Sequence, residues 1–592
     1  MRIAALLKPV LALAAAPTDR ERSWREQDGE LVADPYGLRA VAQACELAAA
    51  VGDGTVTVLT LGPARAADLV RAAMEAGHAT DVVCDGVLLA GPGFAGSDTL
   101  ATARALAAAV SRRDYDLVLA GRSDVDADVG GVGPQLAELL GLPFVGGARH
   151  LSVQRETLRV RCERDDGWAQ VDVEVPAVVS CAERLIDPSW TASAAAPPGP
   201  LEVLTAAELG SGPWGAAASP TRTGAVRTRA VERERLVLDG AGDDAARRAV
   251  ARLRERGALD APAALGAPIP PAQGERGEAV AVAVEPHRSH VGRELLGAAA
   301  RLASAVDGHV VAVSPEPPDA EALASWGADA VVHLQGSDVE EDVAGGLAAW
   351  SRVATPWAIL APSTAWGREV AARAAAQLGA GLIGDAVELA LGEDGRLAAG
   401  VPVLGGQLLV TVSASSPVQL VAVRPGSLAL PRPRAAGRPE IRTMTLERRS
   451  RLRVRSRSRD DDLDLLARAP IVVGVGLGVD RAEYPALAPL LEGLGAELAA
   501  TRPVTDRRWL PHARQVGLTG RAIAPRLYVT VGVRGAFEHM VGACAAGTIL
   551  AVHPDRDTPV FDAADIGIVG DWHRVVPALA AALAGAGVTT GG

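Results

Sequence analysis

The sequence predicts an α/β protein with largely parallel sheets in two successive units and a doubly wound sheet at the C-terminus. Short apolar runs alternate with longer helical stretches over residues 1 to about 200, which is typical of parallel strands joined by crossover helices. The same alternation restarts near Ala279. In the last hundred residues the apolar runs end in Gly, Thr, His or Asp, and parallel sheets bind ligands at such carboxyl ends.

Composition supports several domains with aliphatic cores. The chain has 592 residues, of which 49% are hydrophobic but only 3% aromatic, and this length predicts three or four domains. Its net charge of -12 argues against nucleic acid as the main partner. Five cysteines without a CxxC pair indicate a reducing, cytoplasmic compartment and no disulfide, zinc or Fe–S site.

The N-terminus imitates a signal peptide, but we expect a first strand there. Met1-Arg2 precedes a mostly apolar stretch from Ile3 to Ala16, which Lys8-Pro9 interrupts. Ile3–Leu7 therefore reads as a strand. No run of about 20 uninterrupted apolar residues occurs, so no membrane span is expected.

The first unit shows five strand candidates and four helix candidates in alternation. The predicted strands are Ile3–Leu7, Val56–Leu61, Asp81–Val83, Leu117–Ala120 and Ala177–Cys181. The predicted helices are Leu38–Ala50, Ala64–Ala76, Thr99–Ser111 and Gly133–Leu140.

Three places in this unit carry chemistry. Lys8 ends the first strand, and Asp34 stands just before a helix. A glycine-rich loop, 121–134, leaves the fourth strand and opens the next helix. Such a loop offers free N–H groups and the positive end of a helix dipole to a phosphate.

A cation site in the same loop is a weaker alternative. Asp124, Asp126 and Asp128 have the spacing that begins a calcium loop. The glycine is missing, and position 12 is Gln135 rather than glutamate. Helix capping and loop hydrogen bonds explain the aspartates better, and we expect no metal.

These segments resemble the β subunit of electron transfer flavoproteins (ETFs). That subunit begins M-K-I-x-V-x-V-K, has N-P-F/Y-D before a helix and carries G-x-x-x-x-D-x-D; here Pro176–Val179 and Arg184–Pro188 also match its P-A-V-V and R-L-x-x-P segments. The resemblance implies AMP here in ordinary ETFs and a second FAD in electron-bifurcating ones. Val132-Gly133-Pro134 is more similar to the bifurcating version. The implied binding residues are Lys8, Asp34, Leu61, Gly121, Asp126, Asp128, Gly130, Gly131, Val132 and Gly133.

Residues 189 to 275 resemble the docking loop and C-terminal arm of the β subunit. Trp190–Pro198 lies where the family has a protruding loop with a leucine that inserts into partner dehydrogenases, and it lacks that leucine. The helix Asp243–Arg256 resembles the arm that clasps the FAD domain. Pro262–Glu278 reads as a linker.

The second α/β unit resembles the N-terminal domain of the ETF α subunit, which is a scaffold without a ligand of its own. We interpret the basic run Arg448–Arg459 as a solvated interdomain hinge, with a docking patch as the alternative. The predicted strands are Ala279–Val284, His309–Val313, Ala330–His333, Ala358–Pro362 and Gln419–Val423.

The C-terminal region contains a series of strand-end motifs. Ile471–Gly478 is a strand that runs into a G-V-G-L-G turn, which alone is weak support for a nucleotide. It is followed by Gln515–Gly520, Pro525–His539, Ile549–Asp555 and Asp565–Asp571.

Order and spacing of these motifs resemble the FAD domain of the ETF α subunit over about a hundred residues. The resemblance implies that Arg502 lies against the flavin ring, Thr519 near N5, His539 opposite the C2 carbonyl and Asp571 near the adenosine. The implied FAD residues are Arg502, Gln515, Val516, Gly517, Leu518, Thr519, Gly520, Gly532, Val533, Arg534, Gly535, Ala536, Glu538, His539, His553, Asp555 and Asp571.

Several positions depart from the family pattern. Leu477 replaces the arginine of the G-R-G turn, and Arg534, Glu538 and His553 replace a serine, a glutamine and an asparagine. These changes move charge around the pyrophosphate and the ring. We hypothesise that Arg534 takes over the phosphate-balancing role of the missing arginine.

The resemblance as a whole implies β and α subunits fused in one chain, with Rossmann-like domains of the adenine-nucleotide-hydrolase type. The expected domains are 1–200, 201–275, 276–445 and 446–592. The implied function is to carry electrons through FAD from a dehydrogenase, for example one of the acyl-CoA type in fatty acid β-oxidation, to an ETF:quinone oxidoreductase or other acceptor. A bifurcating NADH-oxidising ETF and a flavin-binding relative without electron transfer are the alternatives. We expect no catalytic residues, and a monomer equivalent to the β/α heterodimer.

Overall fold

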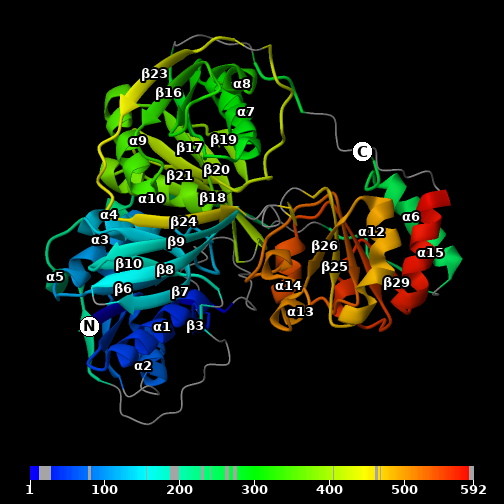
Figure 1. The fold of residues 1–592 in the computed structure, drawn as a ribbon, viewed down its shortest axis with the longest axis horizontal. Helices are drawn as coiled ribbons and strands as arrows, with labels where there is room; N and C mark the ends of the chain where they lie inside the picture. Colours follow the sequence, from blue (N-terminus) through cyan, green and yellow to red (C-terminus); the bar gives the residue numbers. More distant parts are fainter. Residues whose placement is uncertain are drawn as a thin grey trace. The chain divides into compact units, whose positions relative to one another are not determined.

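The computed structural model describes the chain except residues 13–28, 78–81, 155, 184, 187–198, 229–231, 240–241, 261–265, 271–276, 405, 436, 460–464, 467–468 and 586–592. Two compact units emerge (Figure 1). The first unit comprises Met1–Arg227, Ala267–Leu404 and Leu408–Arg459. The second comprises Thr228–Gly266, Gly405–Gln407 and Asp460–Gly592. The predicted docking loop Trp190–Pro198 lies outside the described residues.

The first half of the first unit is built on a ten-stranded sheet. Strands β11, β5, β4, β1, β6, β10 and β7 pair in parallel, and β7, β8, β9 and β24 pair antiparallel. In sheet order the strands are β11 (Leu201–Leu204), β5 (Val83–Leu89), β4 (Thr55–Leu61), β1 (Arg2–Leu6), β6 (Leu117–Gly121), β10 (Ala177–Cys181), β7 (Phe144–Gln154), β8 (Thr157–Arg164), β9 (Gly167–Glu174) and β24 (Arg453–Arg459).

Helices cover both faces of the parallel part of this sheet. Helices α1 (Pro35–Val51) and α2 (Ala67–Gly77) pack their aliphatic side chains on one face, and α3 (Thr99–Val110) and α4 (Val132–Leu140) pack on the other. A two-stranded antiparallel sheet of β2 (Pro9–Leu11) and β3 (Leu31–Ala33) precedes α1, and α5 (Ala206–Leu209) follows β11.

The second half of the first unit repeats this arrangement with a seven-stranded parallel sheet. In sheet order its strands are β18 (Leu382–Ala386), β22 (Gln419–Val423), β17 (Ala358–Pro362), β14 (Ala279–Ala283), β15 (His309–Ser314), β16 (Ala330–Gln335) and β23 (Glu440–Thr445). A separate four-stranded sheet contains β12 (Thr221–Thr228), β21 (Leu408–Ala414), β20 (Leu397–Val403) and β19 (Glu388–Leu391). The helices are α7 (Ser289–Ala305), α8 (Ala320–Ser325), α9 (Glu340–Ala354) and α10 (Ala365–Leu378).

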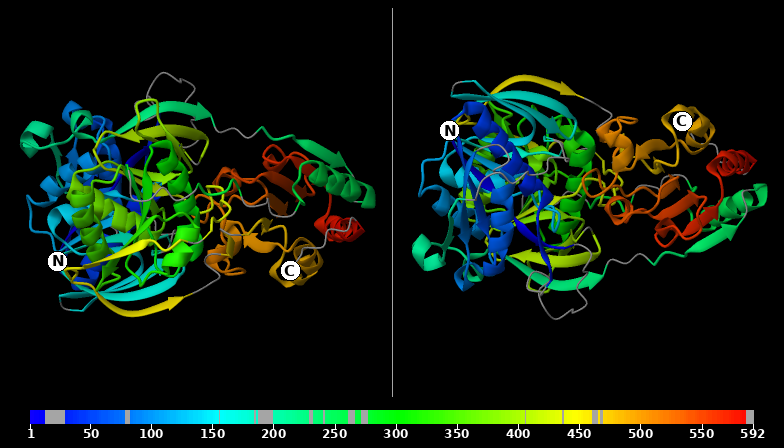
Figure 2. Two further views of the ribbon diagram at one scale, coloured as in Figure 1. Left: turned by 90° about the horizontal axis from the view of Figure 1, so that it is seen from above. Right: turned by 90° about the horizontal axis from the view of Figure 1, so that it is seen from below.

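The second unit is a six-stranded parallel sheet in which the chain order reverses next to β25. In sheet order the strands are β13 (Leu236–Asp239), β29 (Ile566–Val569), β28 (Thr548–His553), β27 (Leu527–Val531), β25 (Ile471–Val475) and β26 (Glu497–Ala500). The helices are α6 (Asp243–Glu255), α12 (Ala488–Leu494), α13 (Arg502–Asp506), α14 (Phe537–Met540) and α15 (Trp572–Gly585), of which α6 and α15 lie side by side (Figures 1 and 2). A reversal of strand order opens a crevice at the carboxyl ends of the central strands.

The predicted α/β class is confirmed, but two sequence interpretations differ from the structure. The strand expected at Asp81–Val83 is β5, which begins at Val83 and continues through the apolar residues to Leu89; Asp81 is outside the described residues. The basic run interpreted as a hinge contains β24, an edge strand that pairs antiparallel with β9 and lies along it in Figure 2. Alternation of arginine with small residues disguised this strand, because none of its side chains is buried. It belongs to the first unit, whereas the sequence placed residue 446 onward with the last domain.

None of the helices that the structure describes combines the length and the hydropathy needed to cross a bilayer.

Candidate functional sites

The glycine turn after β25 is filled by its own neighbouring strand. A Cβ on Gly476 would lie 2.1 Å from the carbonyl oxygen of Gly532, and one on Gly478 would lie 2.9 Å from the Cα of Gly532. One on Gly474 would lie 2.0 Å from the Tyr528 hydroxyl. Glycine is therefore required here for close packing of β25 against β27 and the turn that follows it.

The segment Gln515–Gly520 forms a loop at the carboxyl end of β26. The Val516 N–H donates to the Ala500 carbonyl at 3.0 Å, which fixes the loop beside that strand end. Gly517 has φ 137°, and a Cβ there would lie 2.4 Å from the Glu538 carbonyl oxygen. The Leu518 N–H donates to the same carbonyl. The loop is thus held between β26 and α14, at the strand-order reversal.

A buried amide orients the Thr519 hydroxyl. The Thr505 hydroxyl donates to Gln515 Oε1 at 2.8 Å, and Gln515 Nε2 donates to Thr519 Oγ1 at 3.1 Å. Because the Thr519 oxygen accepts from the amide, its own O–H can donate elsewhere. Thr519 is half-buried, so this donor can face a ligand with an acceptor nitrogen. Thr505 has no counterpart in the sequence prediction.

His539 is buried and held at both ring nitrogens. Nδ1 lies 3.0 Å from the Val516 carbonyl oxygen, so it carries the proton, and Nε2 accepts from the Tyr528 hydroxyl at 2.7 Å. Burial lowers the pKa of His539 to about 4. The imidazole is therefore neutral near pH 7. This pair of contacts ties the loop at Val516 to β27, which the motif alone did not predict.

The remaining predicted FAD residues lie at or after the carboxyl ends of the strands of this sheet. Arg502 begins α13 and pairs with Asp506 at 3.4 Å. Gly535 has φ 82°, and a Cβ there would lie 2.4 Å from Val560 Cα. Arg534 has an exposed side chain, and its carbonyl accepts from the Val560 N–H. Val533 is buried, whereas Ala536 and Glu538 are exposed.

His553 is the last residue of β28, and Asp571 lies just after the end of β29. The His553 ring accepts from the Asp555 N–H at 3.1 Å. Asp571 contacts His573 Nδ1 at 2.8 Å, and Glu483 contacts His573 Nε2 at 2.7 Å. These two carboxylates raise the pKa of His573, Glu483 being the larger influence. Sequence reasoning missed His573, because a lone histidine after a strand carries no motif.

The residues of the second unit fit an FAD. The Thr530 hydroxyl on β27 is buried and has no hydrogen-bond partner in the part of the chain that the structure describes. The Thr519 hydroxyl and the Arg502 guanidinium offer hydrogen-bond donors at this end of the sheet. Donors and cations stabilise the negative charge that a flavin gains on reduction.

In the first unit the glycine loop is held by ion pairs. Lys8 Nζ lies 2.5 Å from Asp126 and 3.5 Å from Asp124. Arg368 of α10, in the second half, pairs with Asp128 at 3.2 Å. Asp34 is buried and its carboxylate accepts from the Val125 N–H at 2.9 Å. The predicted Lys8, Asp34, Asp126 and Asp128 are thus brought together.

Burial changes the titration of two of these carboxyls. It raises the pKa of Asp34 to about 6, while the Val125 hydrogen bond acts in the opposite direction. It also raises the pKa of Asp124 to about 6 against the opposing influence of Lys8. The loop therefore gains protons just below neutral pH. Within the described residues no cluster of three or more His, Cys, Asp or Glu could hold a metal ion.

The N-terminus of α4 has no side-chain cap. Gly131 precedes the helix without a capping hydrogen bond, and Gly130 has φ 62°. Gln135 in this helix is fully buried, yet neither its Oε1 nor its Nε2 has a partner among the described residues. The same holds for the buried Thr60 hydroxyl, next to the half-buried Leu61 at the end of β4. Unsatisfied polar groups of this kind fit a polar ligand.

The equivalent turn in the second half is closed by protein. The Thr364 hydroxyl accepts from the Gly367 N–H at 3.0 Å, and Asp165 from the β8–β9 turn accepts from the Ala365 N–H at 2.5 Å. Side-chain oxygens therefore cap α10 where a phosphate would otherwise bind.

Comparisons with known proteins agree with this geometry. A family model described as "Electron transfer flavoprotein domain" matches residues 24–209 and 283–448, together more than half of the chain. The chain belongs to the electron transfer flavoprotein family. A second model, "Electron transfer flavoprotein FAD-binding domain", matches residues 465–544. Along its sequence, this ETF therefore has two copies of the ETF domain followed by an FAD-binding domain, as expected for a fusion of the β and α types.

Curated relatives named "Protein FixB" match about half of the chain. The protein from Salmonella typhimurium is 33% identical over 290 residues, which cover 48% of this chain and 92% of the relative. That from Rhizobium meliloti is 32% identical over 306 residues, with 48% and 86% covered. That from Escherichia coli O81 is 33% identical over 299 residues, with 49% and 94% covered.

Proposed function

We propose that this ETF carries electrons through one FAD bound in the second unit, from a flavoprotein dehydrogenase to an acceptor such as an ETF:quinone oxidoreductase. The observation that supports this most is the Thr505–Gln515–Thr519 chain, which leaves a hydroxyl donor aimed away from the protein's own amide. FAD, when bound, supplies the redox chemistry. The chain itself supplies position and charge, and needs no nucleophile or general base.

The residues divide into three roles in this proposal. Thr519 donates a hydrogen bond to the ring, Arg502 contributes positive charge beside it, and neutral His539 holds the loop. The backbone of 532–536, with Asp571 and the His553–Asp555 segment, lines the pyrophosphate and adenosine end. The exposure of Arg534 supports our proposal that it balances phosphate charge in place of the arginine replaced by Leu477.

We propose that the glycine loop of the first unit binds an adenine nucleotide. The uncapped α4 and the unsatisfied Gln135 and Thr60 side chains support a ligand at this end of the sheet. AMP is the nucleotide of our main proposal. A second FAD, in a bifurcating NADH-oxidising ETF, is the alternative favoured by Val132-Gly133-Pro134.

The proposed domains are those of the fusion: a β-like domain to residue 200, an arm and linker to 275, an α-like scaffold to 445 and the FAD domain thereafter, except for β24, which pairs with β9 of the first unit. The arm helix α6 shares a hydrophobic core with α15, which supports its role as the arm that holds the FAD domain. A single chain then replaces the β/α heterodimer. An acyl-CoA dehydrogenase is the proposed type of donor.

Anaerobic reduction of the purified, FAD-loaded chain tests these functions. Flavin bleaching by an acyl-CoA dehydrogenase with its substrate, followed by reoxidation by an ETF:quinone oxidoreductase, supports the main proposal. Bleaching by NADH alone favours the bifurcating alternative. A chain that binds FAD but exchanges electrons with neither donor would be the relative that no longer shuttles electrons.

The role of Thr519 has its own test. Thr519→Ala should retain FAD but lower the flavin reduction potential, whereas Thr519→Ser should restore it, because serine keeps the hydroxyl. Unchanged potentials in the alanine variant would contradict the role of this donor.

A further inference from the structure

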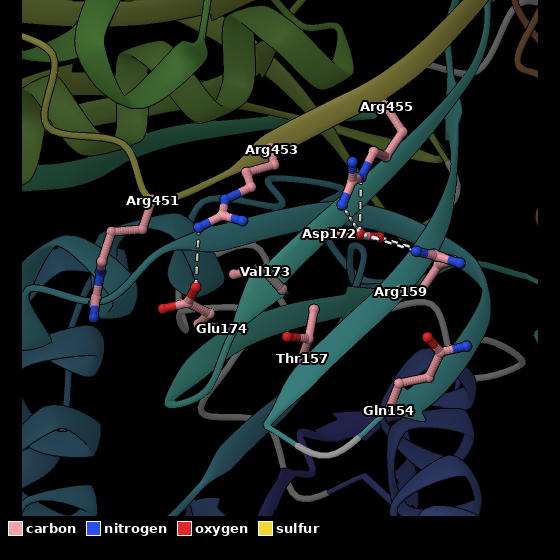
Figure 3. Close-up of a pocket in the computed structure, with 9 residues that line it drawn as sticks. All are labelled: Gln154, Thr157, Arg159, Asp172, Val173, Glu174, Arg451, Arg453 and Arg455. Carbon is pink, nitrogen blue, oxygen red and sulfur yellow. Dashed lines mark hydrogen bonds and ion pairs between the residues drawn. The ribbon is translucent and has the colours of Figure 1, made fainter.

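A basic groove lies on the exposed face of β8, β9 and β24, in the first unit. Its volume is about 370 Å³, at the lower end of the range for ligand clefts. Figure 3 shows four arginine side chains around two carboxylates, contributed by all three strands and the segment before β24. The charged lining residues are Arg159, Arg451, Arg453, Arg455, Asp172 and Glu174.

The strand register explains why these side chains meet. Arg159 on β8 stands opposite Asp172 on β9, and Asp172 stands opposite Arg453 on β24. Residues directly opposite in an antiparallel pair share one face of the sheet. A register shift between Val454 and Ser456 brings Arg455 to the groove as well.

The carboxylates do not balance the guanidinium groups. Asp172 alone accepts from Arg159 at 2.9 and 3.1 Å and from Arg455 at 2.9 Å. Glu174 accepts from Arg453 at 3.3 Å, whereas Arg451 donates to the neutral carbonyl of Gly141 at 3.2 Å. Four cations thus surround two anions.

This excess positive charge is local and is visible in the titration of its central acid. The Arg159 hydrogen bond, followed by that of Arg455, lowers the pKa of Asp172 to about 2 although burial opposes it. The chain as a whole carries a net charge of -12, so the local charge of the groove is opposite in sign to the net charge of the chain. Pairing β24 to β9 through side chains would need only one arginine for each carboxylate.

We propose that this groove binds a pyrophosphate group, either as a free anion or as the diphosphate of a nucleotide. Guanidinium forks bind phosphate oxygens in pairs, and a pyrophosphate offers enough oxygens to contact several of the four arginines at once. A compact groove of this volume suits an anion of this size better than an extended acidic polypeptide. This inference is independent of the flavin site, since every charged residue it uses lies on β8, β9 or the segment 451–455 of the first unit.

Titration calorimetry on the full-length FAD-loaded chain tests the proposal, with inorganic pyrophosphate as the probe. We expect saturable 1:1 binding that weakens as salt rises, since charge pairing in an open groove is screened. The double variant Arg453→Gln/Arg455→Gln should weaken binding at least about tenfold, which is about 1.4 kcal/mol. The matched control is Arg449→Gln, because Arg449 pairs with Glu447 at 3.1 Å and does not line the groove.

Further arms identify the source of the anion and guard against misfolding. ADP that binds much more tightly than pyrophosphate, with the same arginine dependence, assigns a nucleotide; equal affinities assign the free anion. If the glutamine variant is unfolded by circular dichroism, Arg453→Lys/Arg455→Lys replaces it, and should weaken binding while keeping the charge. Equal pyrophosphate affinity in the parent and the variant would overturn the proposal. So would binding of a ten-residue polyglutamate without any binding of pyrophosphate.

Discussion

The two glycine-containing loops of this ETF are held in place by different forces. The loop 121–134 of the first unit is fixed by charge, through Lys8 with Asp126 and Arg368 with Asp128. The flavin loop 515–520 is fixed by neutral hydrogen bonds, from Gln515 to Thr519 and from His539 to Val516. Because the hydrogen bonds that hold the flavin loop are neutral, the charge at a flavin site there comes from the cofactor and from a few side chains. The charged loop, by contrast, should respond to salt and to changes of its own ion pairs.

The largest expected effect comes from adding a Cβ where the flavin loop 515–520 packs closely against the Glu538 carbonyl. Gly517→Ala should reduce bound FAD to below about one tenth of the parent, because a Cβ would overlap the Glu538 carbonyl and φ is positive. Gly493→Ala is the control, since a Cβ there meets nothing within 4 Å. FAD absorbance per chain after gel filtration measures both. Full FAD occupancy in Gly517→Ala would contradict the claim that close packing at Gly517 is needed for FAD binding.

A fall in pH should change the stability contributions of the two loops in opposite directions. His539 has a folded pKa of about 4, below the unfolded value of 6.5, so its contribution to stability is present at pH 7 and is lost as pH falls towards 4. The loss is at most about 3 kcal/mol. Asp34 and Asp124 have pKa values raised from 3.8 to about 6, so they oppose folding above pH 6, and this opposition fades as the pH falls from about 6 to 3.8.

Urea unfolding at pH 7, 5.5 and 4.5, with FAD fluorescence reporting the second unit, measures the acid sensitivity expected from His539. His539→Gln should remove much of the acid sensitivity of the second unit. A parent whose second unit is equally stable at all three pH values would argue against a neutral buried His539.

Neutralising the cation of the charged loop should have a smaller effect. Lys8→Met should weaken AMP binding about tenfold by releasing the Asp124 and Asp126 carboxylates towards the phosphate, and leave FAD content unchanged. Isothermal titration with AMP measures this. Lower FAD content together with unchanged AMP affinity would contradict this role of Lys8, because it would link Lys8 to the flavin loop instead of the loop of the first unit.

The smallest effect concerns the closed turn of the second half. Asp165→Asn should destabilise the first unit by about 1 kcal/mol, because the Ala365 N–H loses a charged acceptor. It should not create a nucleotide site, since Thr364 still caps α10. Thermal unfolding measures the loss, and new AMP binding in this variant would show that Asp165 alone excludes the nucleotide.

Much of the fold was readable from the sequence, because parallel strands buried on both faces are short apolar runs. The edge strand β24 was not, since all its side chains are exposed and its partner β9 lies almost 300 residues earlier in the chain. In the same way, motif spacing singled out Thr519 and His539 but could not show their partners Gln515 and Tyr528 in contact. The contact of Arg368 with Asp128 depends on packing of the two halves, on which a linear motif is silent.

The most direct test of the account is the nucleotide content of freshly purified chain, from its absorbance spectrum and from chromatography of nucleotides released by denaturation. We predict one FAD and one AMP per chain. Two FAD per chain would mean that the charged loop of the first unit binds a second FAD, as in the bifurcating alternative. No FAD, even after reconstitution, would contradict the central claim that the neutral loop 515–520 holds a flavin.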